Sequence, residues 1–588
     1  MLKERFHLLK TATKCLHLLA KHECGYVITS VAVSLTLGAL PTASIIIMQK
    51  IINSLQLGDT CFRDIIILIF LYISLDLISA TISLLHTHYS TIANLRFSKK
   101  IELEMLKKAT NLTLENYEDS ELHNIISRAR NEGLIKIWNC FTNIVSIIKQ
   151  LVSLTCSITI ISIYQPSLIS IILVPVVFRY FVSLKFNKER FEIQRARTTR
   201  ERKAWYITHL VFTGIAFKEI TLFGLQKYLL QKYGNYREKS IAEDIKFSQK
   251  TNSVFWGFSL VDNIIGGVIF IYILSCGYNG NILIGNVISY TRCLFNIKSS
   301  VEAVFSIFDA LAKDSLFVRQ YFDFMELGER PNKVKTIGKI NQITVSNLSF
   351  KYKNSSSYIL QNISFNIKGG DKVLIVGLNG SGKTTLIKLL LGFYDEYEGD
   401  IFINGINLKE IDKISYYAQI SGVFQDFIRY EASLRENVAL SNVSQIENDD
   451  LISCSLALAD FLELFKKNPD TMLGSWFDGA IQLSGGQWQK IALARAFFKD
   501  ASLYLLDEPD SALDVSTENF VLDTFFKKLS SKIGICSSHR FSRMCFYVNK
   551  ILVVDGGMIV EQGTHEELLK SKRLYYKMYQ ESHNYDMQ

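Results

Sequence analysis

The chain has 588 residues, several times the usual length of one domain, so two or more domains are expected. Hydrophobic residues make up 48% and charged residues 21% of it, which excludes a disordered or low-complexity chain. The net charge of +9 could indicate a nucleic-acid partner, but this depends on where the basic residues lie in the chain. The ten Cys are scattered without a CxxC pair, which argues against a zinc site or a disulfide scaffold.

Long apolar runs dominate the first 330 residues. Cys24–Gln49 contains no charged side chain, and a helix rising about 1.5 Å per residue over that length crosses a bilayer core of about 30 Å. The charge-free run between Lys149 and Arg179 is too long for one span, and Pro166 prevents a regular helix through its middle. The alternative, a large soluble helical core, rarely needs runs of this length. We therefore predict a domain of residues 1–330 with six membrane spans at about 24–49, 65–92, 137–163, 167–184, 251–276 and 283–308.

The basic residues predict the orientation of this domain. The segment 185–250 holds fifteen Lys or Arg residues and 96–136 is also basic, whereas the short links hold only Arg63. Basic loops tend to stay in the cytoplasm, so both termini are expected there, in a multi-pass protein of the plasma membrane. This distribution explains much of the net charge, and no nucleic-acid partner is expected. The two basic loops are patterned as helical extensions of the spans.

Residues 331–588 have a different pattern, which predicts an α/β domain with a largely parallel sheet. Short apolar runs alternate with helical stretches such as Thr384–Leu391 and Gly486–Phe498. The predicted strands are Ile343–Val345, Val373–Val376, Leu503–Leu506 and Ile533–Cys536.

A phosphate-binding loop follows the second of these strands. Gly377-Leu-Asn-Gly-Ser-Gly-Lys-Thr384 fits the pattern G-x-x-x-x-G-K-[ST] between a predicted strand and a predicted helix. Its glycines let backbone N–H groups turn toward phosphate oxygens, and the helix start favours negative charge. Lys383 would reach the β- and γ-phosphates, and Thr384 would offer its hydroxyl to Mg²⁺. The alternative is a plain glycine turn, which the flanking strand and helix disfavour.

Two carboxylates end the strand at 503–506. Asp507 can hold Mg²⁺, and Glu508 can orient or deprotonate the attacking water. An Asp-Glu-Pro sequence can also simply end a strand, so this interpretation depends on the phosphate loop.

The order of the motifs resembles the nucleotide-binding domain of ATP-binding-cassette (ABC) transporters, and six spans before it resemble an ABC exporter half-transporter. The resemblance implies an all-α six-helix transmembrane domain of the type I ABC exporter fold, with long cytoplasmic helical extensions, followed by an α/β P-loop ATPase domain. The implied catalytic residues are Glu508, His539 and Gln425, and the implied Mg²⁺ contacts are Thr384, Gln425 and Asp507. The implied ATP contacts are Tyr352, Gly377, Asn379, Gly380, Ser381, Gly382, Lys383, Thr384, Thr385, Ser484, Gly485, Gly486 and Gln487.

In this family the signature Ser484-Gly-Gly-Gln487 binds ATP held by a second subunit. One cassette per chain therefore implies a dimer with two ATP molecules between the cassettes. Glu508, His539 and the Ser-Gly-Gly core are all present, so two identical sites in a homodimer are the simpler expectation.

Three segments bear on coupling between the domains. Tyr117–Asn124 and Lys218–Gly224 resemble the loop-tip helices through which ABC exporters transmit cassette closure, although each could be a solvated turn. Leu473-Gly-Ser-Trp-Phe-Asp-Gly479 departs from the Gly-Glu-x-Gly of multidrug-type exporters, which puts details of coupling in doubt. Trp476 is interpreted as a packing aromatic.

Charged residues inside the apolar runs indicate a polar cavity, because each costs about 2.5–3.5 kcal/mol at a membrane helix centre. They are Asp76, Lys149, Asp262, Arg292 and Lys298. Lys149 and Arg292 could instead reach toward a span end. Asp76 and Asp262 are expected to face the cavity and to favour a polar, partly cationic substrate.

The sequences from Gly474 to Phe498, with Trp488 after the signature, and from Lys218 to Leu225 resemble bacterial lanthipeptide (lantibiotic) exporters. This resemblance implies ATP-driven export of a modified peptide from the cytoplasm by alternating access. Only about 24 residues precede the first span, so a separate leader peptidase is expected if a leader is removed; a peptide-modification enzyme is a further expected partner. The alternatives are a multidrug, lipid or lipid-linked oligosaccharide exporter, and a non-transporting ABC ATPase.

Overall fold

A computed structural model describes residues 2–587 except 59, 119–125, 127–132, 331–332, 354, 510–514, 530 and 539–540. The chain forms two compact units. The first unit comprises 1–111 and 119–328, and the second comprises 329–588 together with Leu112–Glu118. The short segment Leu112–Glu118 therefore packs with the second unit, although it lies within the sequence of the first.

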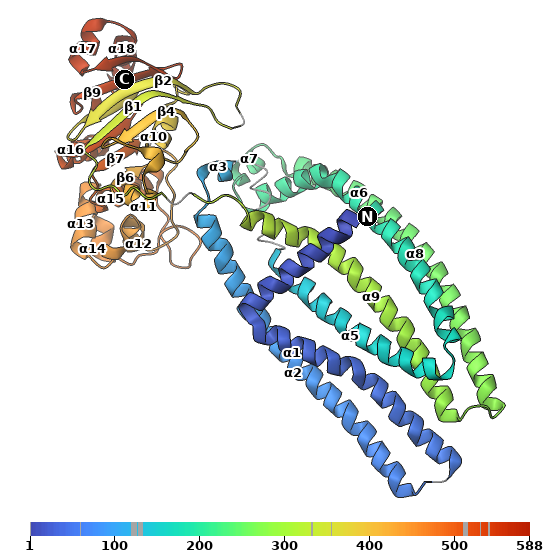
Figure 1. The fold of residues 1–588 in the computed structure, drawn as a ribbon. Helices are drawn as coiled ribbons and strands as arrows, with labels where there is room; N and C mark the ends of the chain where they lie inside the picture. The colour runs from blue at the N-terminus through green and yellow to red at the C-terminus, as the bar shows by residue number, and fades with distance from the viewer. Residues whose placement is uncertain are drawn as a thin grey trace. The chain divides into compact units, whose positions relative to one another are not determined.

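The first unit is built from long helices, which Figure 1 shows as extended rods paired by tight turns. Among the described residues they are α1 (Leu2–Leu57), α2 (Phe62–Thr110), α5 (Leu134–Tyr164), α6 (Ser167–Phe212), α8 (Gln226–Tyr278) and α9 (Ile284–Met325), with the short α7 (Phe217–Leu222) between α6 and α8. Each predicted span lies within one of these helices. The predicted turn at Gln165-Pro166 separates α5 from α6.

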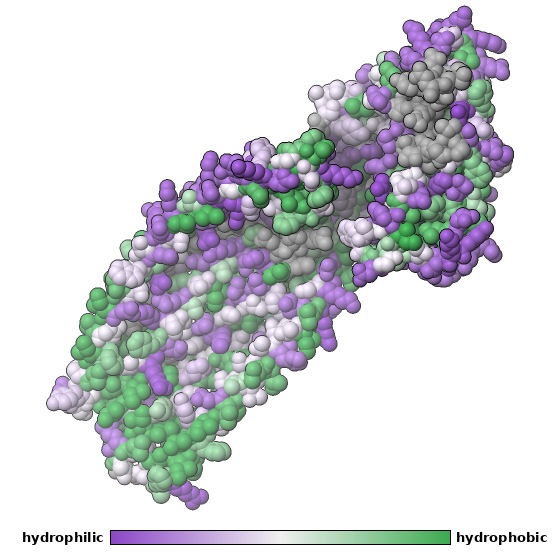
Figure 2. All heavy atoms as spheres, turned by 180° about the vertical axis from the view of Figure 1, so that it is seen from behind, coloured by the Kyte–Doolittle hydropathy of each residue, from purple (hydrophilic) through white to green (hydrophobic). Residues whose placement is uncertain are grey.

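Four of these helices are long and apolar enough to cross a membrane within the described part of the chain. They are Thr11–Leu57 of α1, α2, Ile135–Tyr164 of α5, and α8. The most apolar window of α2 is only 6% buried, and Phe70 and Leu84 are 76% and 72% exposed. The space-filling view shows apolar side chains gathered toward the hairpin turns of this unit (Figure 2). Water would disfavour such a surface, whereas a lipid bilayer would solvate it.

The helix α1 bends at Glu23, which has non-helical φ and ψ of −140° and 53°. Lys100 of α2 holds this bend, because its Nζ donates to the His22 carbonyl and to Glu23 Oε1, both at 2.8 Å. The predicted first span begins one residue later, at Cys24. The first unit therefore starts with a separate helical arm before the apolar helix.

Small residues allow close approach of the helices. A Cβ on Gly38 of α1 would lie 2.7 Å from the Lys149 carbonyl oxygen of α5, and one on Gly285 of α9 would lie 2.4 Å from the Gln49 carbonyl oxygen of α1. Close backbone contact through small residues is typical of helix packing in membranes. The pairs α1–α5, α5–α9 and α1–α9 form one group, and α6 packs mainly on α8.

The second unit combines two sheets with helices. One sheet has the order β2-β1-β4-β5 and is antiparallel, and the other has the order β10-β9-β3-β8-β7-β6. In the second sheet β9, β3, β8, β7 and β6 are parallel, while β10 is antiparallel to β9. The strands are β1 (Gln342–Phe350), β2 (Leu360–Lys368), β3 (Lys372–Val376), β4 (Glu398–Ile403), β5 (Ile406–Asn407), β6 (Ile420–Val423), β7 (Leu503–Asp507), β8 (Ile533–Ser537), β9 (Lys550–Asp555) and β10 (Met558–Gly563).

The helices of the second unit are α3 (Leu114–Glu118), α10 (Lys383–Leu390), α11 (Lys413–Ala418), α12 (Leu434–Ala439), α13 (Asp449–Leu458), α14 (Glu463–Lys467), α15 (Gly485–Phe498), α16 (Val515–Lys528), α17 (His565–Ser571) and α18 (Leu574–Met587). Three of the four predicted strands lie in the parallel sheet and, like the two predicted helices, are confirmed within one or two residues. The fourth, Ile343–Val345, is part of the longer β1, which pairs antiparallel with β2 and β4. The separate antiparallel sheet was not predicted as such, and it encloses a second core against β3, β7, β8 and α10.

Candidate functional site

The phosphate loop connects the end of β3 to the start of α10, as the sequence predicts. Gly380 and Gly382 have φ values of +79° and +105°, which glycine adopts at no steric cost. A Cβ on Gly377 would lie 2.3 Å from the Val554 carbonyl oxygen. Tight turns and a close backbone approach therefore require glycine at all three positions.

Polar groups inside the loop fit a phosphate. Ser381 Oγ is buried and has no hydrogen-bond partner within the described residues. Lys383 Nζ donates to the carbonyl oxygens of Gly377 and Leu378, at 2.9 and 3.2 Å. Burial lowers the pKa of Lys383, and the negative charges of Glu508 and Asp507 oppose that shift. Phosphate oxygens would satisfy the buried hydroxyl and would favour the charged ammonium.

The predicted carboxylates lie at the carboxyl end of the parallel sheet. Asp507 is the last residue of the fully buried β7 and is itself 1% exposed. Ser537 ends the neighbouring β8, pairs with Asp507 in register, and donates from Oγ to Asp507 Oδ1 at 2.5 Å. The Glu508 N–H donates to Ser537 O and Oγ, at 3.2 and 3.1 Å. Ser537 therefore orients both carboxylate residues.

Glu508 has a φ of 49°, a strained conformation for a residue with a side chain. Gln425, in the loop after β6, donates from Nε2 to Glu508 Oε2 at 2.7 Å. The structure thus joins two predicted catalytic residues that are far apart in the sequence. Thr384 lies in the first turn of α10, and α10 packs against β7. The hydroxyl, carboxylate and amide oxygens of Thr384, Asp507 and Gln425 are of the type that Mg²⁺ prefers.

Tyr352 lies between β1 and β2 and contacts the phosphate-loop helix. Its hydroxyl is 3.1 Å from Thr385 Oγ1, and its ring is edge-on to those of Phe350 and Tyr394. The half-buried Tyr352 ring therefore lies beside the phosphate loop, where the resemblance places the adenine.

The signature residues begin α15. Ser484 is the N-cap, and a capping box joins its side chain and backbone to Gln487. Ser484 and Gly485 are exposed, whereas Trp488 is 2% exposed and packs in the core. The first N–H groups of a helix have no partner within the helix, so this exposed start is suited to an anion. Gly486 lies in the first turn of α15, and Asn379 lies in the phosphate loop; both are among the described residues.

Sequence reasoning missed two buried residues that support the site. Ser537 is described above, and Gln489 of α15 donates from Nε2 to the Pro509 carbonyl oxygen at 2.5 Å, directly after Glu508. Their signal in the sequence was weak, because a Ser ending a strand and a Gln in a helix are common. His539 lies outside the described residues.

The segment Leu473–Gly479 starts in the core at the buried Leu473 and is exposed from Ser475 onward. Glu431 Oε2 accepts hydrogen bonds from the N–H groups of Ser475 and Trp476, at 2.8 and 3.2 Å. Trp476 is 82% exposed and Phe477 is 52% exposed. The interpretation of Trp476 as a packing aromatic is therefore wrong for the described chain.

The two loop-tip segments differ in their surroundings. Glu118 of α3 accepts from Tyr394 Oη at 2.8 and 2.9 Å and is 3.5 Å from Lys388 Nζ of α10. The remainder of the predicted element, 119–124, lies outside the described residues. The helix α7, which covers most of Lys218–Gly224, has no buried residue, and Phe217 and Leu222 are 67% and 78% exposed.

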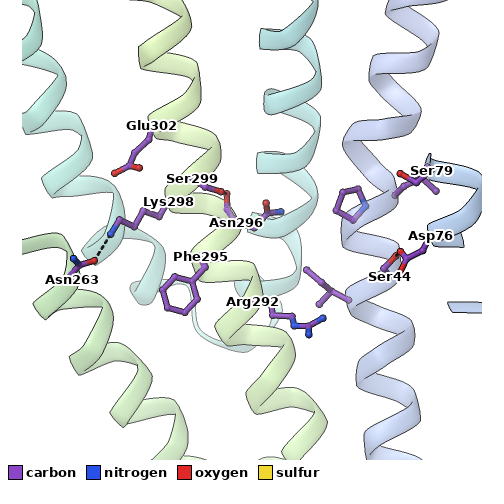
Figure 3. A pocket seen from close by; sticks show the side chains of 13 residues that line it. Ser44, Asp76, Ser79, Asn263, Arg292, Phe295, Asn296, Lys298, Ser299 and Glu302 are labelled. Carbon is purple, nitrogen blue, oxygen red and sulfur yellow. Dashed lines mark hydrogen bonds between the residues drawn. The ribbon is translucent and has the colours of Figure 1, made fainter. Parts of the chain in front are cut away.

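The charged residues of the apolar helices divide into two groups. Asp76, Arg292 and Lys298 line a cavity of about 720 Å³, which Figure 3 shows between α1, α8 and α9. Asp262 lines an adjoining cavity of about 410 Å³, but it is only 7% exposed and lies 3.9 Å from Arg179 Nη1. Lys149 is exposed on α5 and lines neither cavity.

The fold and the site define a class: a phosphate-loop ATPase domain joined to a bundle of long apolar helices. Residues 360–511 match the family described as "ABC transporter", and residues 26–297 match "ABC transporter transmembrane region". The chain belongs to the ABC transporters, with the membrane region and the nucleotide-binding domain on one polypeptide.

Individual relatives match almost the whole chain. The subtilin transport ATP-binding protein SpaT of Bacillus subtilis is 37% identical over 99% of this chain and 96% of its own length. The nisin transport ATP-binding protein NisT of Lactococcus lactis subsp. lactis is 33% identical over 98% of this chain and 97% of its own length. A solved structure of a bacterial Atm1-family ABC exporter with ATP bound has the same fold, with a TM-score of 0.84 at 20% identity, over 95% of this chain and 98% of that chain.

These matches confirm the predicted type I ABC exporter fold and the ATPase activity coupled to transport. The chain binds ATP, is embedded in the plasma membrane through several helices, and has the half-transporter layout that functions as a dimer.

Proposed function

We propose that this protein is a homodimeric exporter of a lanthipeptide precursor, driven by ATP hydrolysis. The main support is the full-length similarity to proteins whose names give subtilin and nisin transport. The similarity to these relatives covers nearly the whole of this chain, so it includes both the membrane region and the ATPase domain. The six spans proposed for the domain of residues 1–330 are those predicted above, with both termini in the cytoplasm and the ATPase domain at 331–588.

In the proposed ATP site, Gly377–Thr385 surround the phosphates, and Lys383 pairs with the β- and γ-phosphates. Tyr352 provides an aromatic face for adenine beside Thr385, to which it is hydrogen-bonded. Ser484, Gly485, Gly486 and Gln487 of a second copy would bind the γ-phosphate from the other side. The exposed start of α15 supports this assignment, because it is open to a partner.

Thr384, Asp507 and Gln425 are proposed to hold Mg²⁺, which would neutralise charge on the phosphate oxygens during transfer. Glu508 is the proposed general base that orients the attacking water, and Gln425 holds one of its carboxylate oxygens. His539 is proposed to contact the γ-phosphate.

The helix α3 is proposed to transmit movements of the ATPase domain to the membrane helices. Its Glu118 bonds to Tyr394, whose ring contacts Tyr352 beside the phosphate loop. A change at the nucleotide can therefore reach α3 through two directly contacting aromatic residues. The helix α7 is proposed to do the same with a second copy, since its apolar side chains are exposed.

The decisive experiment is ATPase activity and ATP-dependent peptide uptake in inside-out proteoliposomes. We expect leader-bearing lanthipeptide precursors to stimulate hydrolysis, and lipids and drugs to have little effect. Glu508→Gln should lower the ATPase rate by about 100-fold or more, since it removes the base. Stimulation only by lipids or drugs would refute peptide export, and a fully active Glu508→Gln protein would refute the assigned base.

A further inference from the structure

The larger cavity of the helical unit is polar although apolar helices surround it. It has a volume of about 720 Å³ and is lined from α1, α2, α8 and α9. A second cavity of about 410 Å³ shares Asn263, Phe295 and Lys298 with it, so these residues stand between the two. Figure 3 shows Lys298 directed toward Asn263 and Arg292 extending from α9 on the side of α1.

Most acidic groups around these cavities already have partners. Glu302 Oε1 lies 2.7 Å from Arg179 Nη1, and Asp262 Oδ2 lies 3.9 Å from the same nitrogen. The Arg179 guanidinium therefore compensates these two carboxylates in part. Asp76 Oδ1 accepts from Ser44 Oγ at 3.4 Å. Apart from its 3.9 Å ion pair with Arg179, Asp262 Oδ2 is buried and has no hydrogen-bond partner among the described residues, and the expectation that Asp262 favours a cationic substrate stays a prediction.

Two cations of the cavity also lack a carboxylate partner among the described residues, so together with Asp76 they leave an excess of one positive charge there. Arg292 has neither a hydrogen bond nor an ion pair with any residue that the structure describes. Lys298 has a 3.3 Å hydrogen bond to the neutral Asn263 Oδ1 and no carboxylate within ion-pair distance among the described residues. A cation within a membrane span costs about 2.5–3.5 kcal/mol by insertion scales, so two uncompensated cations favour an anionic ligand.

We propose that Arg292 and Lys298 bind carboxylates of an acidic segment in the transported peptide. This inference rests on the proposed peptide export and adds the chemistry that selects the substrate. Arg292 can bind a carboxylate through two parallel N–H···O hydrogen bonds, and Lys298 can bind a second one through its ammonium charge. Asp76, on the opposite wall, disfavours carboxylates near α2 and so directs the acidic segment toward α9.

The spacing of the two cations indicates the form of the segment. Six residues along α9 correspond to a rise of about 9 Å and a rotation of about 600°, so Arg292 and Lys298 leave the helix in directions about 120° apart (Figure 3). Their charged ends are therefore farther apart than the rise alone, and an extended peptide, which advances about 3.3 Å per residue, needs carboxylates about five positions apart to reach both.

The test uses the full chain in inside-out proteoliposomes with two synthetic peptides of equal length. One carries Asp at two positions about five residues apart, the spacing derived above, and the other carries Asn at both. We expect the Asp peptide to bind wild type about 10-fold or more tightly than the Asn peptide, because charge-assisted bonds are lost in the latter. The double variant Arg292→Gln/Lys298→Gln should bind both peptides equally weakly, because neither carboxylates nor amides then meet a cation.

Lys149→Gln is the matched control, since it removes a cation from the apolar helices outside both cavities. Equal affinity of wild type for the two peptides would overturn the inference and leave peptide export intact. Absence of binding and stimulation by both peptides and by lanthipeptide precursors would overturn both. A change from dimer to monomer in Arg292→Gln/Lys298→Gln, measured by native mass spectrometry, would show that a second copy compensates the cations and would also overturn the inference.

Discussion

At the scale of single residues, the ATPase site depends on a serine that does no chemistry itself. Ser537 is fully buried and contacts both residues of the carboxylate pair, through Asp507 Oδ1 and the Glu508 N–H. Its hydroxyl holds Asp507 in one orientation, and its backbone and side chain together support the strained Glu508. Groups that orient metal ligands in this way contribute to metal affinity without touching the metal.

Ser537→Ala should raise the Mg²⁺ concentration for half-maximal ATPase activity by about 10-fold or more. It should also lower the free energy of unfolding by about 1–3 kcal/mol, because a buried carboxylate loses its donor. Titration of Mg²⁺ in the ATPase assay checks the first effect and thermal unfolding the second. The control is Ser421→Ala. Ser421 lies in β6 of the same sheet, and its hydroxyl donates a buried hydrogen bond to the Ala496 carbonyl oxygen of α15. This variant should lower stability without changing the Mg²⁺ requirement; an equal Mg²⁺ shift in both variants would contradict the role of Ser537.

At the scale of elements, the short helix α3 packs on the ATPase domain through two acidic residues with opposite effects. Glu118 is satisfied by Tyr394 and Lys388. Burial raises the pKa of Glu115, and the negative charges of Glu396 and Asp395 raise it further, while Lys353 lowers it. The ionised form of Glu115 therefore weakens the packing of α3 at neutral pH, whereas the contacts of Glu118 with Tyr394 and Lys388 strengthen it.

Glu115→Gln should raise the melting temperature at pH 7.5, because the folded state no longer holds a disfavoured carboxylate. A raised pKa means that the folded state binds the proton more tightly, so wild-type stability increases as the pH falls toward that pKa. The advantage of Glu115→Gln should consequently shrink at pH 5. Glu118→Gln is the control with the opposite sign and should lower stability by about 1 kcal/mol. Destabilisation by Glu115→Gln at pH 7.5 would refute this account.

At the scale of the whole molecule, the phosphate loop and the signature of one chain are proposed to serve different ATP molecules. A dimer with two-fold symmetry then contains two identical composite sites. Either Lys383→Ala or Ser484→Arg should inactivate both sites of a homodimer. Lys383→Ala removes the phosphate-loop half of each composite site, and Ser484→Arg removes the signature half.

Random mixing of the two variants should restore about one quarter of the wild-type ATPase activity, because half of the dimers would each have one intact site. Co-expression with two affinity tags provides the check: the unselected mixture should show about one quarter of the wild-type rate, and the purified mixed dimer, with one intact site of two, about one half. Each variant expressed alone is the control and should be inactive. No recovery in the mixed dimer would refute composite sites formed by two copies of this chain.

The local chemistry of the ATPase site was readable from the sequence because it depends on contiguous residues. The phosphate loop needs a strand, glycines at set positions and a helix start, all within one short segment, and β3 and α10 confirm them. The runs that form the membrane helices are likewise local, since their length and apolar character are set residue by residue. Even the turn between α5 and α6 follows from the missing N–H and fixed φ of Pro166.

Tertiary structure decided which distant groups compensate one another. The hydrogen bond from Gln425 to Glu508 depends on loops at the ends of separate strands, and the contact of Glu118 with Tyr394 joins segments separated by 276 positions. No local pattern shows that Arg179 of α6 lies near Asp262 and Glu302 while Arg292 has no partner in the part of the chain that the structure describes. Sequence alone determined what each segment could become, because backbone preference and hydrophobicity act over a few residues. The charge that the cavity presents was decided only by packing, because ion pairs depend on distances of a few ångströms between helices.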